Sequence, residues 1–161
     1  MNGRTRAIAI IAAVLILDRI TKYYIQTNFS LYDVVAVIPN VFNIVHAENP
    51  GAAFSLLADA PLAVRRAILV VLSGAVMLTI GFLLFRDNKE SASTNIGLAL
   101  VLGGALGNFW DRVVVGTVTD FIQVFLGSYE YPSFNVADSA IFCGAVLLIW
   151  DLLRGRKSKA A

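Results

Sequence analysis

The chain of 161 residues is 58% hydrophobic and only 15% charged, with a mean hydropathy of +0.74. Soluble domains carry about a quarter charged residues, so the composition excludes an ordinary soluble domain and predicts one membrane-embedded α-helical domain over residues 1–161. The net charge of +2 is too small to indicate nucleic acid as a partner. The single cysteine, Cys143, excludes an intramolecular disulfide and a cysteine-based metal cluster.

The first apolar segment covers residues 7–25 and follows two arginines, which is the pattern of a signal peptide. Asp18, Arg19 and Lys22 stand where a small-residue cleavage site would be expected, so we predict an uncleaved membrane anchor. Asp18 and Lys22 are four residues apart and therefore share one face of a helix, where they can form an ion pair. Two interpretations stay open: a pair that merely ends the span at the membrane surface, and a polar group with a role in the outer half of the membrane.

Residues 29–60 do not resemble a spanning helix and predict a small extramembranous sheet. The β-branched segment 34–38, a turn signal and the segment 41–45 predict two strands. His46 is the only histidine and has no second ligand of its kind, so a structural role is favoured. The turn at Gly51 is followed by small residues that allow a peptide chain to approach closely.

Three further apolar segments cover residues 64–85, 95–110 and 136–153. Small residues recur at every fourth position from Ala99 to Gly107, a pattern that lets helices pack closely in lipid. Together with the first segment, these three predict four transmembrane helices.

An even number of spans places both termini on one side of the membrane. Basic residues gather at the N-terminus, in the loop 86–94 and in the C-terminal tail, so the positive-inside tendency predicts that this side is cytoplasmic. Arg65 and Arg66 lie on the opposite side, against this tendency, where they can reach lipid headgroups or belong to an interfacial helix. The loops 29–62 and 111–135 then face outward.

Asp120 and Asp138 bracket one short polar loop at this outer boundary, and residues 113–118 are predicted to form a short strand or hairpin that delivers Asp120. A carboxylate beside hydrocarbon is costly, so two of them suggest a pair meant to meet. Two carboxyl groups held close together share a proton and supply both an acid and a base for hydrolysis. Asn135 and Asp138 also fit a helix capping box, so capping and catalysis both stay open.

Five short motifs run through the outward-facing parts of the chain. They are Asp18-Arg19-Ile20-Thr21-Lys22, Glu48-Asn49-Pro50-Gly51-Ala52-Ala53-Phe54, Gly107-Asn108-Phe109-Trp110-Asp111-Arg112, Val118-Thr119-Asp120-Phe121 and Phe134-Asn135-Val136-Ala137-Asp138-Ser139. In these motifs and in their order the chain resembles the lipoprotein signal peptidases, also called signal peptidase II. Arg19 is a departure, because that family often has a neutral glutamine there, and we expect little consequence.

The resemblance implies a membrane-embedded aspartic endopeptidase with Asp120 and Asp138 as the catalytic pair and with no metal or other cofactor. It also implies a set of residues that bind substrate or support the pair, namely Asp18, Lys22, Asn49, Gly51, Asn108, Arg112 and Asn135. The implied substrate is a bacterial prolipoprotein, cut immediately before a diacylglyceryl-modified cysteine. The implied setting is the bacterial inner membrane, with a monomer among membrane lipids, both termini cytoplasmic and the active site at the outer leaflet.

Three other functions compete with this one: a proton-coupled transporter that uses intramembrane carboxylates, a non-catalytic scaffold whose Asp and Asn residues only cap helices, and a metal-dependent hydrolase. The carboxylates cluster at one interface and the two halves of the chain show no repeat, which disfavours the transporter. A further hypothesis is that the outer sheet and the loop up to Arg65 form a cradle and a lid over the substrate.

Overall fold

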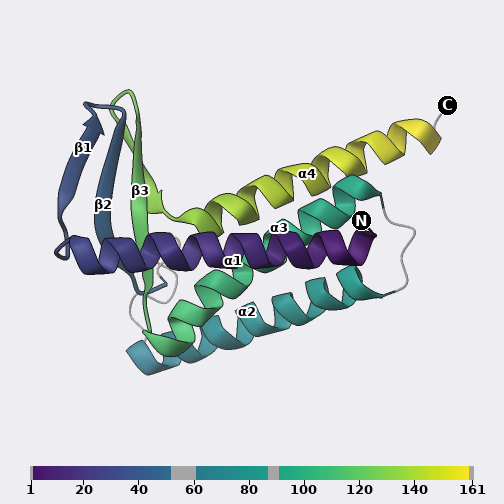
Figure 1. Ribbon diagram of the computed structural model, residues 1–161, viewed down its shortest axis with the longest axis horizontal. Helices are drawn as coiled ribbons and strands as arrows, with labels where there is room; N and C mark the ends of the chain where they lie inside the picture. Colours follow the sequence, from purple (N-terminus) through teal and green to yellow (C-terminus); the bar gives the residue numbers. More distant parts are fainter. Residues whose placement is uncertain (1, 52–60, 87–90, 160–161) are drawn as a thin grey trace.

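The computed structural model describes residues 2–51, 61–86 and 91–159, and in these ranges four long helices run beside one another with a small sheet at one end (Figure 1). The helices are α1 (Gly3–Asn28), α2 (Leu62–Phe85), α3 (Ala92–Val114) and α4 (Val136–Lys159). The strands are β1 (Val34–Ile38), β2 (Phe42–Asn49), β3 (Val118–Leu126) and β4 (Tyr129–Phe134). The start of α1 and the end of α4 both lie at the end of the bundle opposite the sheet. The predicted fold class, a helical membrane protein with a small sheet, is confirmed.

Three of the described helices are long and apolar enough to cross a membrane: Ala63–Phe85, Ala92–Val114 and Val136–Arg154. Helix α1 has 26 residues, or about 39 Å at 1.5 Å per residue, which is sufficient length for a span. Charged residues between Asp18 and Lys22 interrupt its apolar run, so the fourth span stays a prediction.

Helix α1 buries its ion pair. The helix continues past Lys22 to Asn28, and the side chains of Asp18 and Lys22 are both 0% exposed. The pair therefore lies inside the protein, which favours a role beyond ending the span, and its position relative to the membrane surface stays a prediction.

Glycines of α3 set how closely its neighbours approach. A Cβ atom at Gly103 would lie 3.0 Å from the Cβ of Val14 in α1. A Cβ atom at Gly104 would lie 2.3 Å from the backbone oxygen of Ala137 in α4. Close packing through the predicted small-residue face is thus confirmed toward α1, and Gly104 adds a second close contact, toward α4, that the four-residue repeat does not contain.

Gly104→Ala is expected to lower the free energy of unfolding by about 1–3 kcal/mol, because the added methyl group must push α4 away from α3. Gly81→Ala in α2 is the matched control, since nothing lies within 4 Å of a Cβ there. We expect the control to stay within about 1 kcal/mol of the parent protein. Unfolding in detergent micelles measures both, and equal effects at the two positions would contradict the close contact.

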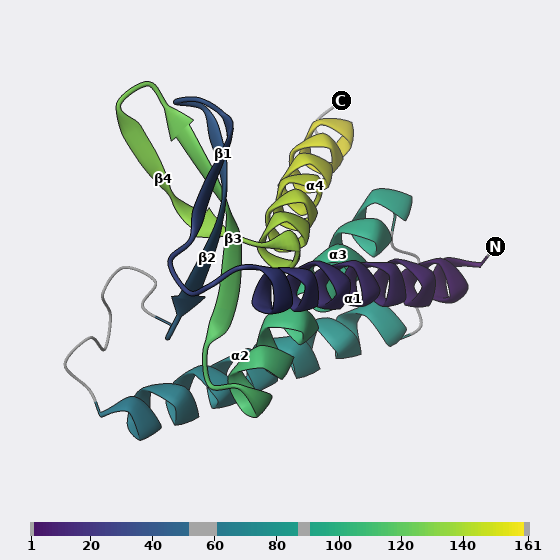
Figure 2. The same cartoon turned by 60° about the vertical axis from the view of Figure 1, so that its left-hand side comes forward.

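The sheet is antiparallel with the strand order β1-β2-β3-β4, and β3 runs from the sheet to the end of α3 (Figure 2). Strand β1 occupies its predicted range, whereas β2 extends beyond its prediction because its last residues pair with β3, with Ala47 opposite Asp120. The register of this pairing shifts between Ile44 and Ala47. Such bulges bend a strand and redirect side chains, and this one lies directly beside Asp120.

The prediction of a strand or hairpin over residues 113–118 is wrong. Helix α3 continues to Val114, and the backbone N–H groups of Val115 and Gly116 both donate to the carbonyl oxygen of Asp111, at 2.8 and 2.9 Å. Gly116 then turns the chain with a φ of 99°, and the strand begins only at Val118. The β-branched residues favour a strand only weakly, and the continued helical hydrogen bonds outweigh that preference.

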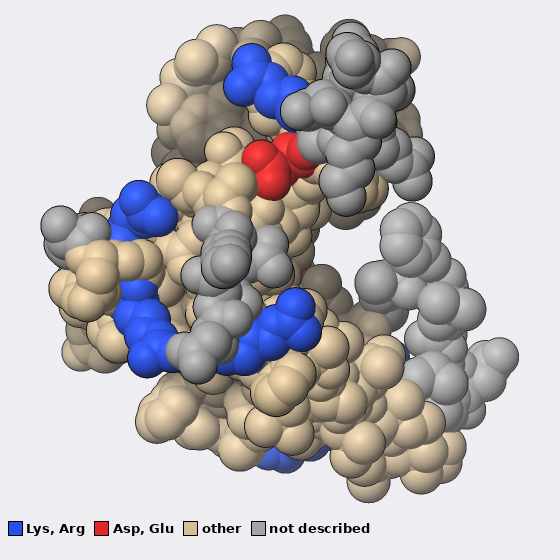
Figure 3. Space-filling view, turned by 90° about the vertical axis from the view of Figure 1, so that its right-hand side faces the viewer, with Lys and Arg blue, Asp and Glu red and all other residues tan. Residues whose placement is uncertain are grey.

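Arginines gather at the end of the bundle that holds the start of α1 and the end of α4. Figure 3 views the molecule from this end and shows several blue groups with little red. The described arginines there are Arg4, Arg6, Arg86 and Arg154, which lie at the start of α1, the end of α2 and the last turns of α4. The two ends of the bundle therefore differ in charge as well as in structure.

Candidate active site

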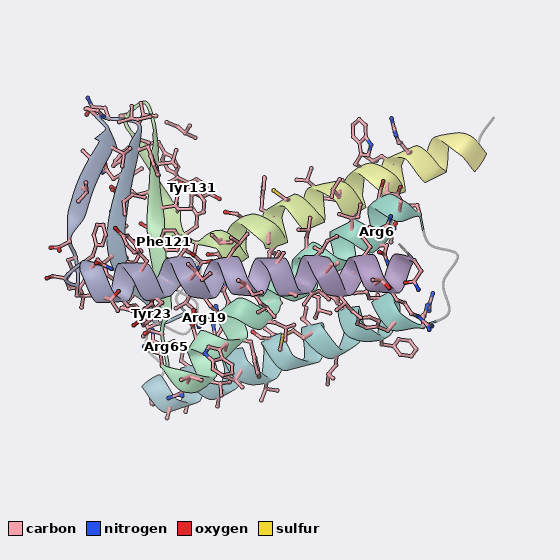
Figure 4. All side chains as sticks on the ribbon, viewed as in Figure 1. Arg6, Arg19, Tyr23, Arg65, Phe121 and Tyr131 are labelled. Atoms are coloured by element: carbon pink, nitrogen blue, oxygen red, sulfur yellow. The ribbon has the colours of Figure 1, made fainter. Side chains whose placement is uncertain are left out.

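Asp120 and Asp138 come together where β3 meets the start of α4, although they are carried by different elements. The side-chain amide of Asn135 donates to Asp120 Oδ1 at 2.7 Å. The backbone N–H of Asn135 donates to Asp138 Oδ2 at 3.2 Å. One fully buried residue thus links both carboxyl groups, and Asp120 itself is only 3% exposed. Figure 4 shows the next residue, Phe121, on β3 where the sheet meets the helices.

The capping box that the sequence left open is present at the start of α4. The backbone N–H of Asp138 donates to Asn135 Oδ1 at 2.9 Å, while Asp138 accepts from the Asn135 backbone N–H. Reciprocal bonds of this kind satisfy the free amides of a first helical turn. The capping bonds therefore hold the Asp138 carboxyl group against Asn135, whose side chain also contacts Asp120. A capping role for Asp138 is thus compatible with its pairing with Asp120.

Two further asparagines, one in β2 and one in α3, donate hydrogen bonds to the carboxyl groups. The amide of Asn49 donates to Asp120 Oδ2 at 3.0 Å, and its oxygen accepts the backbone N–H of Gly51 at 2.9 Å. The amide of Asn108 donates to Asp138 Oδ1 at 2.7 Å. Both carboxyl groups consequently have both oxygens in hydrogen bonds, which restricts each to one orientation.

A buried ion network between α1 and α3 supports this arrangement. Lys22 Nζ lies 2.8 Å from Asp18 Oδ2, 2.7 Å from Asp111 Oδ2 and 3.0 Å from Asn108 Oδ1. Asp18 also accepts the backbone N–H of Ala137 at 3.0 Å, so α1 helps to cap α4. The network therefore fixes Asn108, and through it Asp138, from a helix distant in sequence.

The environment of Asp120 favours its protonated form. Burial is the largest cause and, with the nearby charge of Asp138, raises the pKa of Asp120 to about 7. Hydrogen bonds from Asn49 and Asn135 and the charge of Lys22 act in the opposite direction without cancelling the effect of burial. A carboxyl group with such a pKa can hold a proton near neutral pH and release it during a reaction.

A profile of the family described as Signal peptidase (SPase) II matches residues 10–154 of the chain. The chain belongs to the signal peptidase II family. A lipoprotein signal peptidase of Solibacter usitatus (strain Ellin6076) is 44% identical over 157 residues, which cover 98% of this chain and 96% of that protein. A lipoprotein signal peptidase of Pseudomonas aeruginosa (strain PAO1) is 42% identical over 160 residues, covering 99% and 94% of the two chains.

A solved structure shows the same fold. A bacterial membrane enzyme determined by the in meso method at 2.3 Å superposes with a TM-score of 0.86 at 32% sequence identity, covering 96% of this chain and 92% of that one. Membership of the signal peptidase II family, together with the spanning helices, makes this chain a bacterial membrane protein and a peptidase.

In this member of the signal peptidase II family, Gly51 and Arg112 each contact one of the asparagines that hold the carboxyl groups. Gly51 has a φ of 93°, and a Cβ there would lie 2.0 Å from Leu69 of α2, so only glycine fits. Arg112 donates to the backbone oxygen of Asn108 at 3.3 Å, within its own helix. The small residues after Gly51 and the proposed lid fall on 52–60, outside the described residues.

The only histidine makes two structural contacts. His46 Nδ1 lies 2.9 Å from the backbone oxygen of Phe29, and Nε2 lies 3.2 Å from Glu48. Among the described residues, no group of three or more His, Cys, Asp or Glu side chains could hold a metal ion. Both contacts agree with the structural role predicted for His46 in this signal peptidase II family member.

No role was predicted from sequence for three polar residues near Asp120. Glu48 of β2 accepts hydrogen bonds from the hydroxyl groups of Thr117 and Thr119, at 2.5 and 2.8 Å. This contact joins β2 to β3 just before Asp120. The available signal was the spacing of Thr117 and Thr119, which places both hydroxyl groups on one face. This signal could be used only if the pairing of β2 with β3 were already known. Asp111 likewise had no role predicted from sequence, although it is an acid of the buried network.

Proposed function

We propose that this protein is a membrane-embedded aspartic endopeptidase that removes the signal peptide from diacylglyceryl-modified bacterial prolipoproteins, cutting just before the lipidated cysteine. The observation that carries the proposal is the link from Asp120 through Asn135 to Asp138. The relatives are named lipoprotein signal peptidases, which supports the substrate class. The other residues named by the resemblance surround this pair and act as its supports.

The pair performs hydrolysis by sharing one proton. Asp120 holds this proton, because its burial favours the neutral form, and Asp138 is the ionised base. Asp138 takes a proton from a water molecule, whose oxygen forms a bond to the scissile carbonyl carbon. The proton of Asp120 stabilises the developing oxyanion. The carbon–nitrogen bond then breaks as the proton held by Asp138 passes to the leaving amine.

This assignment predicts how kcat depends on pH. Above a pH of about 7, Asp120 loses the proton that the proposed reaction needs, so kcat should fall. The amide of Asn49 stabilises the charged form of Asp120, so Asn49→Ala should raise the pKa and move this decline to higher pH. Rate measurements across pH on a lipidated precursor test both statements.

Asn43→Ala is the matched control for the pH profile. Asn43 lies on the same strand as Asn49, but its amide donates to Gln123, at 2.7 Å, instead of to the carboxyl pair. Its profile should coincide with that of the parent protein. A decline that stays in place or moves to lower pH in Asn49→Ala would contradict the assignment of the proton to Asp120.

The orientation of the site follows from charge. Arginines gather at the end of the bundle that holds the start of α1 and the end of α4, and this favours that end as cytoplasmic (Figure 3). The sheet and the carboxyl pair then face the outer leaflet of the bacterial inner membrane, with α1 as the fourth span. A lipid-modified precursor would keep its acyl chains in the bilayer while its scissile bond reaches the pair.

The experiment compares two precursor peptides that differ only in the diacylglyceryl group. Purified protein in detergent should cut the lipidated peptide at the bond preceding the modified cysteine and leave the unlipidated one intact, as mass spectrometry of the products would show. A chelator should not change the rate, which separates this enzyme from a metal-dependent hydrolase. Cleavage elsewhere, or equal cleavage of both peptides, would refute the proposal.

A further inference from the structure

A hollow of about 590 Å³ lies at the end of the bundle near the sheet, between the first turns of α2 and the turn that joins α3 to β3. We call it the α2–α3 hollow. Its walls include Arg66, Ala67 and Val70 of α2 and Val113, Val115 and Gly116 of the turn. The volume lies within the range of small-molecule sites, and none of the residues used by the carboxyl pair lines it.

The apolar residues in and beside the hollow are exposed at the surface of the bundle. Val113 and Val115 are 44% and 54% exposed, and the neighbouring Val71 of α2 is 71% exposed. In a spanning bundle these apolar surfaces face lipid rather than water. A lipid molecule is therefore the natural occupant of the hollow, where its acyl chain would cover Val113 and Val115.

Arg66 is the cation among the described residues that line the hollow. The guanidinium group of Arg66 donates through Nη2 to the backbone oxygen of Val113, which holds the head of the side chain over the turn. In the ranges 2–51, 61–86 and 91–159, no acidic residue lines the hollow, and no ion pair includes Arg66. Figure 4 places the adjacent Arg65 at the end of α2 near the sheet, whereas Arg6 lies at the opposite end of the bundle.

The polar groups around the hollow do not suit a peptide. The oxygen of Val113 is bonded to Arg66, and the N–H groups of Val115 and Gly116 are bonded to Asp111. The hydroxyl group of Thr117 donates to Glu48. An extended peptide needs backbone partners, whereas an acyl chain below an anionic group needs only an apolar wall and a cation.

We propose that the α2–α3 hollow binds an anionic phospholipid, with its phosphate group against Arg66 and an acyl chain along α2 and α3. Basic pockets between membrane helices recognise such headgroups. The proposal goes beyond peptide cleavage, because it involves no bond breaking and none of the carboxyl groups. It also accounts for an arginine that the positive-inside tendency disfavours at this end.

The test measures lipid binding to the purified full-length chain in detergent by native mass spectrometry. Phosphatidylglycerol and phosphatidylcholine with the same acyl chains are the two probes. We expect preferential retention of phosphatidylglycerol, and Arg66→Gln should reduce its binding about fivefold, the effect of one basic group near a membrane surface. Arg66→Lys, which keeps the charge, should retain the preference.

Two further variants distinguish lipid binding in the hollow from nonspecific attraction of an anionic lipid to basic residues. Arg65→Gln removes the same charge from the neighbouring residue, which does not line the hollow, and should leave binding unchanged. Ala67→Phe fills the hollow without changing charge and should reduce binding as strongly as Arg66→Gln. Equal losses in Arg65→Gln and Arg66→Gln, no loss in Ala67→Phe, or equal binding of both lipids by the parent protein would overturn the proposal.

Discussion

Asp120→Asn and Asp138→Asn are each expected to lower kcat for cleavage of a lipidated precursor by about 10²- to 10⁴-fold, with little change in KM. An amide has nearly the same shape as the carboxyl group but cannot exchange the proton that hydrolysis requires. In Asp138→Asn the side-chain amide still offers an oxygen to the backbone N–H of Asn135, so the cap of α4 should persist. Single-turnover kinetics together with an unfolding measurement test this prediction.

The control for the carboxyl pair is Asp33→Asn. Asp33 lies near the same sheet and accepts the backbone N–H of Ser30 at 2.8 Å, and this bond keeps its carboxyl group within its own turn rather than in the pair. Its turnover should match that of the parent protein. If Asp120→Asn and Asp138→Asn both kept full turnover while folding normally, the Asp and Asn residues would serve only as helix caps, as in the alternative of a non-catalytic scaffold.

Lys22→Met is expected to lower the free energy of unfolding by about 3–5 kcal/mol. The substitution leaves the buried carboxylates of Asp18 and Asp111 without the Lys22 ammonium group, which lies within 2.8 Å of each. Breaking a buried ion pair in this way costs more than the pair contributes, because the remaining charge has no solvent to replace its partner. Unfolding by denaturing detergent in mixed micelles gives the quantity directly.

Arg19→Gln provides the comparison for this ion network. Arg19 also contacts Asp111, but its side chain is 31% exposed and can be replaced by solvent. The loss should therefore stay below about 1 kcal/mol. A Lys22→Met variant no less stable than Arg19→Gln would show that Lys22 is not the central charge of the network.

The carboxyl pair could be predicted from sequence because both acids flank one short polar loop next to apolar segments, and because the five short motifs resemble the signal peptidase II family. Asp138 also stands three residues after Asn135, which is the spacing of a capping box, whereas the strand expected over residues 113–118 does not form. The ion pair of Asp18 and Lys22 also follows from helical spacing alone. These signals depend only on neighbours in the chain.

Other parts of the site depend on contacts between distant segments and could not be predicted in the same way. The importance of Asp111 appears only once α1 crosses α3 and places Lys22 beside it. Strand β4 contains Pro132, which argues against a strand in sequence but is tolerated at the edge of a sheet. The helical course of Val113 and Val114 also required the hydrogen bonds of the folded chain.

The bond between Asp18 and the backbone of Ala137 joins the first helix of the described chain to the last one. During synthesis at the ribosome, the partner of Asp18 therefore emerges after more than a hundred intervening residues have been inserted. The first turn of α4, which carries Asp138, can form this bond only after α1, α2 and α3 have been made. Under the proposed function, a chain that lacks α4 would therefore lack peptidase activity.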